Sequence, residues 1–149
     1  MRCILQRVTH SEVEIDQKIN GAIKDGYMIL VGFEASDTNE VVDKMINKII
    51  HLRVFEDENH KMNKSLLDVN GSILSISQFT LYASCKNGRR PSFTDAAKPD
   101  VAIPLYDYFN ETLRNQNIVV ETGIFGADMK VTLLNDGPIT IILDSDELF

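Results

Sequence analysis

Segments with the apolar pattern of β-strands follow one another along this chain, and only two stretches repeat their apolar residues at helical spacing. The first helix is predicted from a cap at Asp37 or Thr38 to Ile50, and the second from about Val101 to Gln116. The strand-like segments are Arg2–Val8, Ser11–Ile15, Tyr27–Phe33, Leu52–Glu58, Ser72–Ala83, Ile118–Phe125, Met129–Leu134 and Ile139–Asp144. Because strands and helices do not alternate regularly, we expect an α+β fold with two helices. Its mostly antiparallel or mixed sheet would curl like a β-barrel.

The size and charge of the chain limit the classes to which it can belong. Its 149 residues are expected to form a single domain, 1–149, that needs no disulfide framework. Two cysteines, no secretory signal and no membrane-spanning segment predict a cytoplasmic protein. A net charge of −7 argues against broad nucleic-acid binding through phosphate neutralisation, but it leaves room for a local basic patch.

The stretch 131–144 contains an unusual proline. Residues 135–137, Asn-Asp-Gly, separate two apolar runs, which is typical of a hairpin turn. Pro138 follows at the point where a hairpin strand would normally begin to donate hydrogen bonds, and proline has no N–H. The local pattern favours a simple turn, and a functional use of the Gly-Pro pair is the alternative.

The usual catalytic motifs are absent. The sequence has no P-loop, no Rossmann fingerprint and no Gly-x-Ser-x-Gly elbow, and its three histidines lack partners at metal-ligand spacing. The segment 72–83 is more informative, because each face of this strand would mix polar and apolar side chains. Ser77, Gln78 and Thr80 would offer hydroxyl and amide groups beside a pocket, where backbone N–H groups can stabilise an oxyanion. An ordinary sheet-edge strand is the simpler interpretation.

Two loops are candidate binding elements. Lys86, Arg89 and Arg90 surround a glycine, and arginine suits bidentate contact with phosphate. Such loops are often only solvated, but in so acidic a chain this one is a candidate anchor for a phosphate-bearing end. Phe125 and Met129 lie beside glycines that permit tight turns, and they are predicted to be core residues or pocket walls.

Together these segments resemble the D-aminoacyl-tRNA deacylase family over nearly the whole chain. The matching segments are NGAIKDGYMILVGF (20–33), LRVFEDENHKMNKSLLDV (52–69), SQFTLYA (77–83), GRRPSF (88–93), TGIFGADMKV (122–131) and NDGPIT (135–140). SQFTLYA and the late Gly-Pro pair are the most specific of them.

The resemblance implies a cytosolic homodimer with a β-barrel-like fold that needs neither a metal nor an organic cofactor. It implies hydrolysis of the ester that joins a D-amino acid to the terminal adenosine of tRNA, with glycine on tRNA(Ala) also accepted. The partner would be the 3′ end of aminoacyl-tRNA, with Lys86, Arg89 and Arg90 as candidate contacts.

The resemblance also implies the residues of the site. Those matching the pocket that receives the adenosine and the ester are Ser77, Gln78, Phe79 and Thr80, with Leu81, Phe125 and Met129 as substrate-binding neighbours. Each subunit would insert Gly137 and Pro138, joined by a cis bond, into its partner's pocket. Their carbonyl oxygens would face the substrate's α-ammonium group and exclude L-amino acids. Arg7 would help to hold this pair in its orientation.

The sequence allows more than one role for Thr80 and more than one activity for the protein. Thr80 is a nucleophile by type, but no histidine lies nearby in sequence to activate it. The resemblance instead implies attack by water, assisted by the substrate's ribose 2′-hydroxyl, with N–H groups near Phe79 stabilising the oxyanion. One alternative is a dimeric nucleic-acid-binding module without hydrolysis. Another is a related deacylase with a trans Gly137–Pro138 bond and different chiral selectivity.

Overall fold

The computed structural model describes residues 1–149 and contains eight strands and three α-helices. The strands are β1 (Arg2–Ile15), β2 (Lys18–Ile23), β3 (Gly26–Gly32), β4 (Phe55–Glu56), β5 (Met62–Lys64), β6 (Ser72–Ser77), β7 (Val120–Thr122) and β8 (Lys130–Asp144). The helices are α1 (Asn39–His51), α2 (Pro99–Asn115) and α3 (Ser145–Leu148), and a 3₁₀ helix spans Phe79–Tyr82. The predicted α+β class is confirmed. The predicted number of helices was wrong, because a helix as short as α3 has no apolar period to detect.

Strand β1 organises the main sheet because three other strands pair with it. β3 lies along residues 2–8, β2 lies along residues 11–15, and β8 runs antiparallel along most of β1. β6 and β7 extend the sheet from β3 in parallel. The sheet is therefore mixed, in agreement with the sequence prediction.

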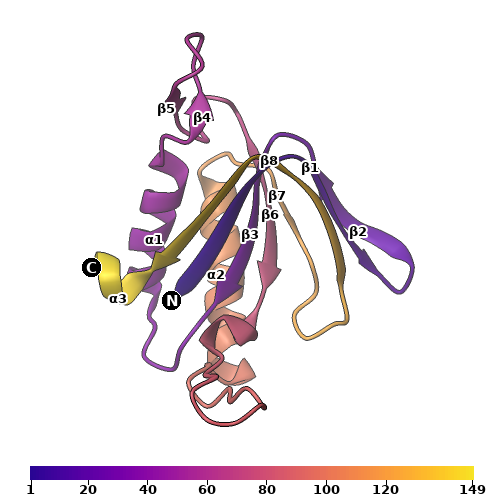
Figure 1. Ribbon diagram of the computed structural model, residues 1–149, viewed down its shortest axis with the longest axis vertical. Coiled ribbons are helices and arrows are strands. Elements are labelled where there is room, and N and C mark those ends of the chain that lie inside the picture. Colours follow the sequence, from indigo (N-terminus) through magenta and orange to yellow (C-terminus); the bar gives the residue numbers. More distant parts are fainter.

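The main sheet curls until its edges nearly meet. β2 and β7 stand at opposite ends of the strand order, yet Asn20 Nδ2 of β2 donates to the Thr122 carbonyl of β7 at 2.7 Å. A Cβ on Gly21 would lie only 3.1 Å from the Cβ of Glu121, so glycine permits this approach. Figure 1 shows α1 and α2 on one side, and β2 bending away from them with the neighbouring parts of β1 and β8. The expected barrel-like curl is confirmed.

Two apolar cores lie against the main sheet. The larger core packs α1 and α2 against the strands and includes Met45, Ile49 and Phe109, all fully buried. The smaller core consists of Val8, Val13, Ile23, Met28, Leu74 and Ile76. Met129 and Val131 pack against the smaller core but are only partly buried. The smaller core is therefore incompletely covered, and the candidate site lies at its edge.

Two predicted pairs of strands are in fact single strands. Segments 2–8 and 11–15 together form β1, which accommodates the expected break as shifts of register against β8. Segments 129–134 and 139–144 together form β8, so residues 135–137 do not make a hairpin turn. The reason is that β1 pairs with β8 on both sides of this point.

Other predicted boundaries also need correction. The segment 72–83 is extended only to Ser77, so the residues that follow do not alternate across a sheet. Between β1 and β2 only the positive-φ residues Asp16 and Gln17 turn, and β2, which the sequence did not predict, begins at Lys18. Helix α2 begins at Pro99, which places Pro104 in its second turn. None of the helices has the length and apolar character that crossing a membrane requires.

Candidate active site

A cavity of about 240 Å³ opens beside the smaller core, between the end of β6 and the segment that joins β7 to β8. We call it the β6–β8 pocket. Its lining residues are Ile76, Ser77, Gln78, Phe79, Phe125, Gly126, Ala127, Met129 and Val131. The fold thus brings five of the predicted site residues together from two distant parts of the sequence: Ser77, Gln78, Phe79, Phe125 and Met129.

One wall of the pocket forms where the chain leaves the sheet after β6. The Gln78 N–H donates to the Val31 carbonyl at 2.7 Å, and the next residues wind into the 3₁₀ helix. β3 can pass this close because residue 32 is glycine, where a Cβ would lie 2.8 Å from the Gln78 carbonyl oxygen. The first N–H groups of a helix have no partner within it. Those of Phe79 and Thr80 are therefore donors that an oxyanion could use.

The side chains of Gln78 and Thr80 contact each other rather than a catalytic base. Gln78 Nε2 donates to Thr80 Oγ1 at 2.6 Å. Thr80 is exposed and does not line the pocket. Leu81 also lies outside the pocket, where it faces Gly32 and its carbonyl accepts a hydrogen bond from Arg2 Nη1 at 3.2 Å. These two predicted site residues can therefore affect the pocket only from its margin.

Gly137 and Pro138 form an exposed corner within β8. The peptide bond between them is cis, and Gly137 has a φ of +134°. The side chain of Asn135 spans this corner: its Oδ1 accepts from the Ile139 N–H at 3.0 Å and its Nδ2 donates to Thr140 Oγ1 at 2.9 Å. These hydrogen bonds hold the backbone where Pro138 has no N–H to offer.

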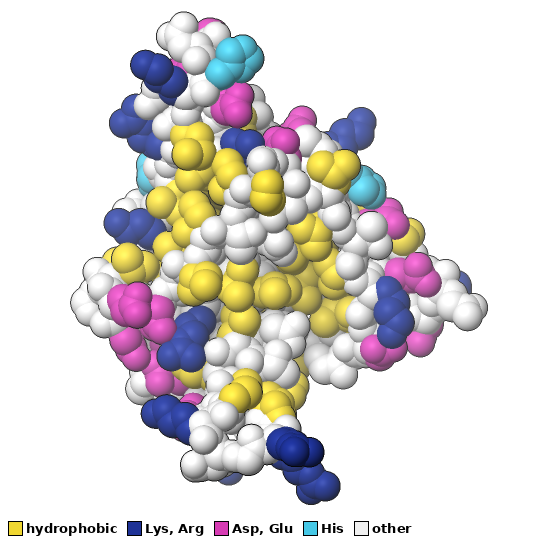
Figure 2. Space-filling model, in the orientation of Figure 1, with side chains coloured by type: hydrophobic (Ala, Val, Ile, Leu, Met, Phe, Trp, Pro, Cys, Tyr) yellow, Lys and Arg dark blue, Asp and Glu magenta, His cyan; other side chains and the backbone are white.

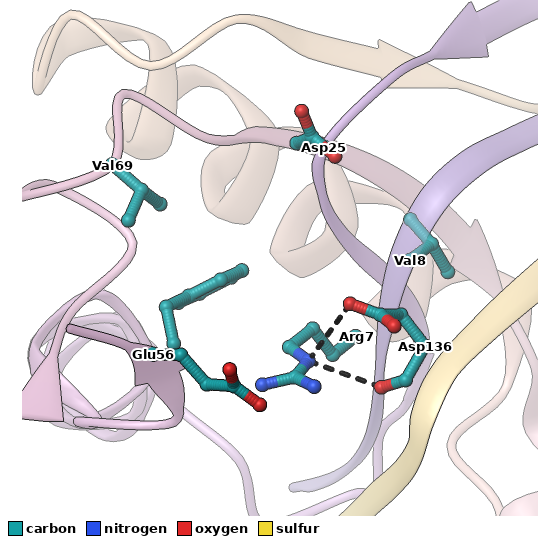
Figure 3. Close-up of a pocket in the computed structure, with 7 residues that line it drawn as sticks. Arg7, Val8, Asp25, Glu56, Val69 and Asp136 are labelled. Atoms are coloured by element: carbon teal, nitrogen blue, oxygen red, sulfur yellow. Dashed lines mark hydrogen bonds and ion pairs between the residues drawn. The ribbon is translucent and has the colours of Figure 1, made fainter. Parts of the chain in front are cut away.

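Arg7 of β1 packs against the same corner. Its side chain is 7% exposed, Nε donates to the Asp136 carbonyl at 3.0 Å, and Nη1 donates to the Val54 carbonyl at 2.8 Å. Figure 3 shows the guanidinium group near Asp136 and Glu56, in the wall of a separate cavity of about 360 Å³. Burial raises the pKa of the neighbouring Tyr27, although the Arg7 charge opposes this, so Tyr27 stays neutral at physiological pH. The hydrogen bonds of Arg7 to Asp136 and Val54 connect the corner to the rest of the domain.

The corner and the β6–β8 pocket are separate within one chain. Val131 of β8 lines the pocket, and Gly137 follows it six residues later in the same strand. At about 3.3 Å per extended residue, the two positions are at most roughly 20 Å apart. Neither Gly137 nor Pro138 lines the pocket of its own chain.

The predicted basic anchor, Lys86, Arg89 and Arg90, lies in an exposed loop. Pairing between Ser84 and Ser92 closes this loop. Beyond it, Phe93 packs edge-on against Phe79 of the pocket, with ring centroids 5.1 Å apart and both rings exposed. Figure 2 shows Lys and Arg side chains projecting from the lower end of the molecule, where the loop between the 3₁₀ helix and α2 lies in Figure 1. The loop is therefore next to the pocket.

Several residues of the pocket and the corner were not predicted. The additional lining residues are Ile76, Gly126, Ala127 and Val131. They have small or apolar side chains, which give no chemical signal in a sequence. Asn135 was interpreted only as a turn residue. Its position two residues before a Gly-Pro pair was the available signal, since asparagine side chains often bond to nearby backbone groups.

Comparison with known proteins identifies the family. Residues 4–144 match the D-Tyr-tRNA(Tyr) deacylase family. The chain belongs to this family. It is 57% identical over 147 residues to a D-aminoacyl-tRNA deacylase of Bacillus pumilus (strain SAFR-032), covering 99% of this chain and 100% of that protein. It is 53% identical to a D-aminoacyl-tRNA deacylase of Thermus aquaticus, covering 99% and 97% of the two chains.

Solved structures share this deacylase fold. A structure described as the c-Myc DNA Unwinding Element Binding Protein has a TM-score of 0.90 and 38% identity, covering 97% of this chain and 98% of that one. A probable eukaryotic D-amino acid tRNA deacylase has a TM-score of 0.83, covering 95% and 97%, but at 20% identity it supports the fold alone. The family resemblance predicted from SQFTLYA and NDGPIT is confirmed.

Proposed function

We propose that the protein hydrolyses the ester bond of D-aminoacyl-tRNA in the β6–β8 pocket, releasing the D-amino acid and tRNA in the cytoplasm. Family membership over nearly the whole chain supports the reaction. The observation that carries the site assignment is the convergence of Ser77–Phe79 with Phe125 and Met129 on one cavity. Glycine on tRNA(Ala) would also be accepted, because an achiral amino acid offers nothing for a chiral filter to reject.

In this proposal water is the nucleophile, assisted by the 2′-hydroxyl of the substrate's terminal ribose. Attack on the ester carbonyl creates an oxyanion, which the N–H groups of Phe79 and Thr80 would stabilise. The Thr80 hydroxyl is bonded to the Gln78 amide at 2.6 Å and has no base to take its proton. Thr80 would therefore position the substrate rather than attack it.

A second copy of the chain would complete each site with its Gly137–Pro138 corner. The corner does not line the pocket of its own chain, from which it lies up to roughly 20 Å along β8, whereas a two-fold partner could supply it. Exposed apolar side chains on β8 support such a dimer, since Leu134 is 56% and Ile142 is 71% exposed. Figure 2 shows hydrophobic side chains gathered across the middle of the visible face. Apolar patches of this kind mark interaction surfaces.

Backbone atoms of the corner would read the chirality of the substrate. The carbonyl oxygens of Gly137 and Pro138 can accept hydrogen bonds from an α-ammonium group, which has three donors. Asn135 and Arg7 brace the corner, so it cannot rotate aside as a free side chain could. An L-amino acid would therefore meet a steric conflict that the site cannot relieve.

The basic loop would contact the tRNA near its 3′ end. The loop containing Lys86, Arg89 and Arg90 is exposed and is connected to the pocket through the Phe79–Phe93 contact. Phosphate contacts by such side chains weaken as salt increases. The proposal therefore predicts that added salt raises KM more than it lowers kcat.

The direct test is a paired assay with D-tyrosyl-tRNA and L-tyrosyl-tRNA. We expect the D form to be hydrolysed at least about 10²-fold faster, because rejection depends on a steric conflict. Intact D-tyrosyl-tRNA after incubation with purified protein would refute the proposal. Hydrolysis of L-alanyl-tRNA would instead indicate a deacylase with different chiral selectivity.

One observation favours testing a second function, binding of duplex DNA. A relative in structure at 38% identity is described as a DNA unwinding element binding protein. The net charge of −7 opposes strong duplex binding. A gel-shift with duplex DNA and uncharged tRNA separates the two functions. Tight duplex binding without turnover of D-aminoacyl-tRNA would favour the binding module.

A further inference from the structure

The side chain of Tyr106 in α2 contacts Phe125 in one wall of the β6–β8 pocket and Ser75 of β6, the strand that leads into the other wall. Its hydroxyl donates to the Ser75 carbonyl of β6 at 2.7 Å, and both residues are buried. Its ring packs against the ring of Phe125, with centroids 6.3 Å apart and an interplanar angle of 53°. Phe125 lines the pocket, but Tyr106 itself does not. Tyr106 can therefore act on the pocket only through its neighbours.

The Ser75 carbonyl is a junction between the two walls. It accepts from the Tyr106 hydroxyl and also from the Gly123 N–H at 3.3 Å. Ser75 precedes Ser77, the last residue of β6, and Gly123 precedes Phe125 in the opposite wall. The Ser75 carbonyl therefore connects β6 to the start of the second wall, and the Tyr106 hydroxyl holds this carbonyl in place.

Several buried residues around the Tyr106 hydroxyl are polar, and burying a polar group without a hydrogen-bond partner destabilises the fold. Besides Tyr106, Ser75 is 0% and Asn110 is 4% exposed, and Ser75 Oγ and Asn110 Oδ1 have no hydrogen-bond partner. Buried polar groups without partners destabilise a fold, and an apolar side chain would avoid that cost. Phe109 in the same helix is fully buried without any polar atom. The Tyr106 hydroxyl differs from Ser75 Oγ and Asn110 Oδ1 because it has a partner, the Ser75 carbonyl, so its contribution lies in that one hydrogen bond.

We propose that Tyr106 is a positioning residue for ester hydrolysis. Its hydroxyl fixes the end of β6, and hence the Phe79 N–H, relative to the Phe125 wall. The inference rests on the proposed assignment of the reaction to the β6–β8 pocket. Because a misplacement of about 1 Å can cost up to about 10²-fold in rate, a loosened junction should affect the chemical step.

The test compares Tyr106→Phe with Tyr108→Phe in the same helix. Each substitution removes one hydroxyl, but the Tyr108 hydroxyl donates to Asp43 Oδ1 at 2.9 Å, away from the pocket. With D-tyrosyl-tRNA we expect Tyr106→Phe to lower kcat about tenfold with KM within about twofold, because the hydroxyl does not touch the substrate. Tyr108→Phe should keep the wild-type kcat. In NMR spectra, the amide signals of Phe79 and Gly123 should shift only in Tyr106→Phe.

A third variant, Phe125→Ala, separates this inference from the site assignment. If Phe125→Ala lowers kcat while Tyr106→Phe stays within twofold of wild type, the positioning role is refuted and the pocket assignment stands. If Phe125→Ala leaves both kcat and KM unchanged, the pocket assignment fails, and the positioning role fails with it. Equal losses of kcat in Tyr106→Phe and Tyr108→Phe would mean a general effect of helix stability and would also overturn the inference.

Discussion

Gly137 has a backbone conformation and close contacts that its proposed function requires. Its φ of +134° is rarely adopted by L-residues with a side chain. A Cβ there would lie 2.7 Å from Ile139 Cγ1 and 3.4 Å from Arg7 Nη2. A side chain at this position would displace the corner that Asn135 and Arg7 hold. The local sequence pattern predicted only a turn glycine, and the resemblance implied a functional Gly-Pro pair, but the contact with Arg7 depends on the long-range pairing of β1 with β8.

Gly137→Ala should therefore damage activity more than stability. We expect a loss of about 1–3 kcal/mol in the free energy of unfolding from backbone strain. We expect kcat/KM for D-tyrosyl-tRNA to fall by about 10²-fold, because the carbonyl oxygens would be misplaced. Urea unfolding and the deacylation assay measure the two effects. Asn70→Ala is the control: it puts alanine at a φ of +50° outside both the corner and the β6–β8 pocket, so activity should be kept. Full activity of Gly137→Ala would remove the corner from the mechanism.

At the residue scale, the Asp144 carboxylate also makes the stability of the fold depend on pH. Partial burial acts to raise the pKa of Asp144, but hydrogen bonds from Arg2 Nε and the Asp146 N–H outweigh it, so the pKa is lowered. A lowered folded-state pKa stabilises the fold above the unfolded value of about 3.9, and this stabilisation is lost as the pH falls through the folded value.

Comparing wild type with Asp144→Asn in urea from pH 7 to pH 2 measures this contribution. Because the pair is partly exposed, we expect wild type to be more stable by about 1 kcal/mol or less at pH 7, with the difference vanishing at the acid end. Asp128→Asn, at an exposed carboxylate paired with Lys130, is the control and should show no measurable difference. A difference between wild type and Asp144→Asn that grows toward low pH would contradict this assignment.

At the scale of elements, the sequence predicted whether a segment is a helix or a strand better than it predicted where the element begins and ends. Periodic apolar residues located α1 and most of α2, because a helix buries one face whatever it packs against. Strand ends were less predictable, since tertiary pairing determines them. β8 is continuous because β1 pairs on both sides of the corner, and β6 ends at Ser77 where the 3₁₀ helix begins. The SQFTLYA segment was predicted to form part of the site, and its first three residues line the β6–β8 pocket, although most of the segment is a 3₁₀ helix rather than a strand.

Pro104 in α2 allows a prediction about helix stability. It is exposed in the second turn, and its missing N–H leaves the Asp100 carbonyl without its helical partner. Pro104→Ala should raise the free energy of unfolding by about 1–2 kcal/mol, because the greater flexibility of the unfolded chain offsets part of the gain. Thermal or urea unfolding measures this. Pro99→Ala, at the first helical position where proline is tolerated, should not stabilise. A destabilised Pro104→Ala would show that the proline is needed for packing.

At the scale of the whole molecule, the main questions are what covers the apolar surface of β8 and what completes the pocket. Composition and charge indicate a globular protein, but they cannot show which strand will be left uncovered. Leu134 and Ile142 became interpretable only when β8 was seen along β1 with both side chains exposed. The division of the proposed site between the pocket and a corner up to roughly 20 Å away along β8 likewise depends on the fold.

Ile142→Lys tests the proposed dimer surface. A charge at this 71% exposed position should cost the monomer little, but it should oppose burial against a second copy. We expect sedimentation to show a dimer for wild type and a folded monomer with little deacylase activity for the variant. Val119→Lys, at an apolar side chain that is 61% exposed before β7, should remain dimeric and active. An active monomeric Ile142→Lys would show that one chain suffices.

Subunit complementation tests the central claim, that each site combines the pocket of one chain with the corner of another. Phe125→Ala damages the pocket and Gly137→Ala damages the corner, and each homodimer should be nearly inactive. In a random equal mixture half of the dimers are mixed, and each has one intact site of two, so about one quarter of wild-type activity should return. Mixed dimers isolated after co-expression with two affinity tags should have about half of wild-type activity toward D-tyrosyl-tRNA, because each has one intact site of two. Mixed dimers no more active than the single-variant homodimers would contradict the claim.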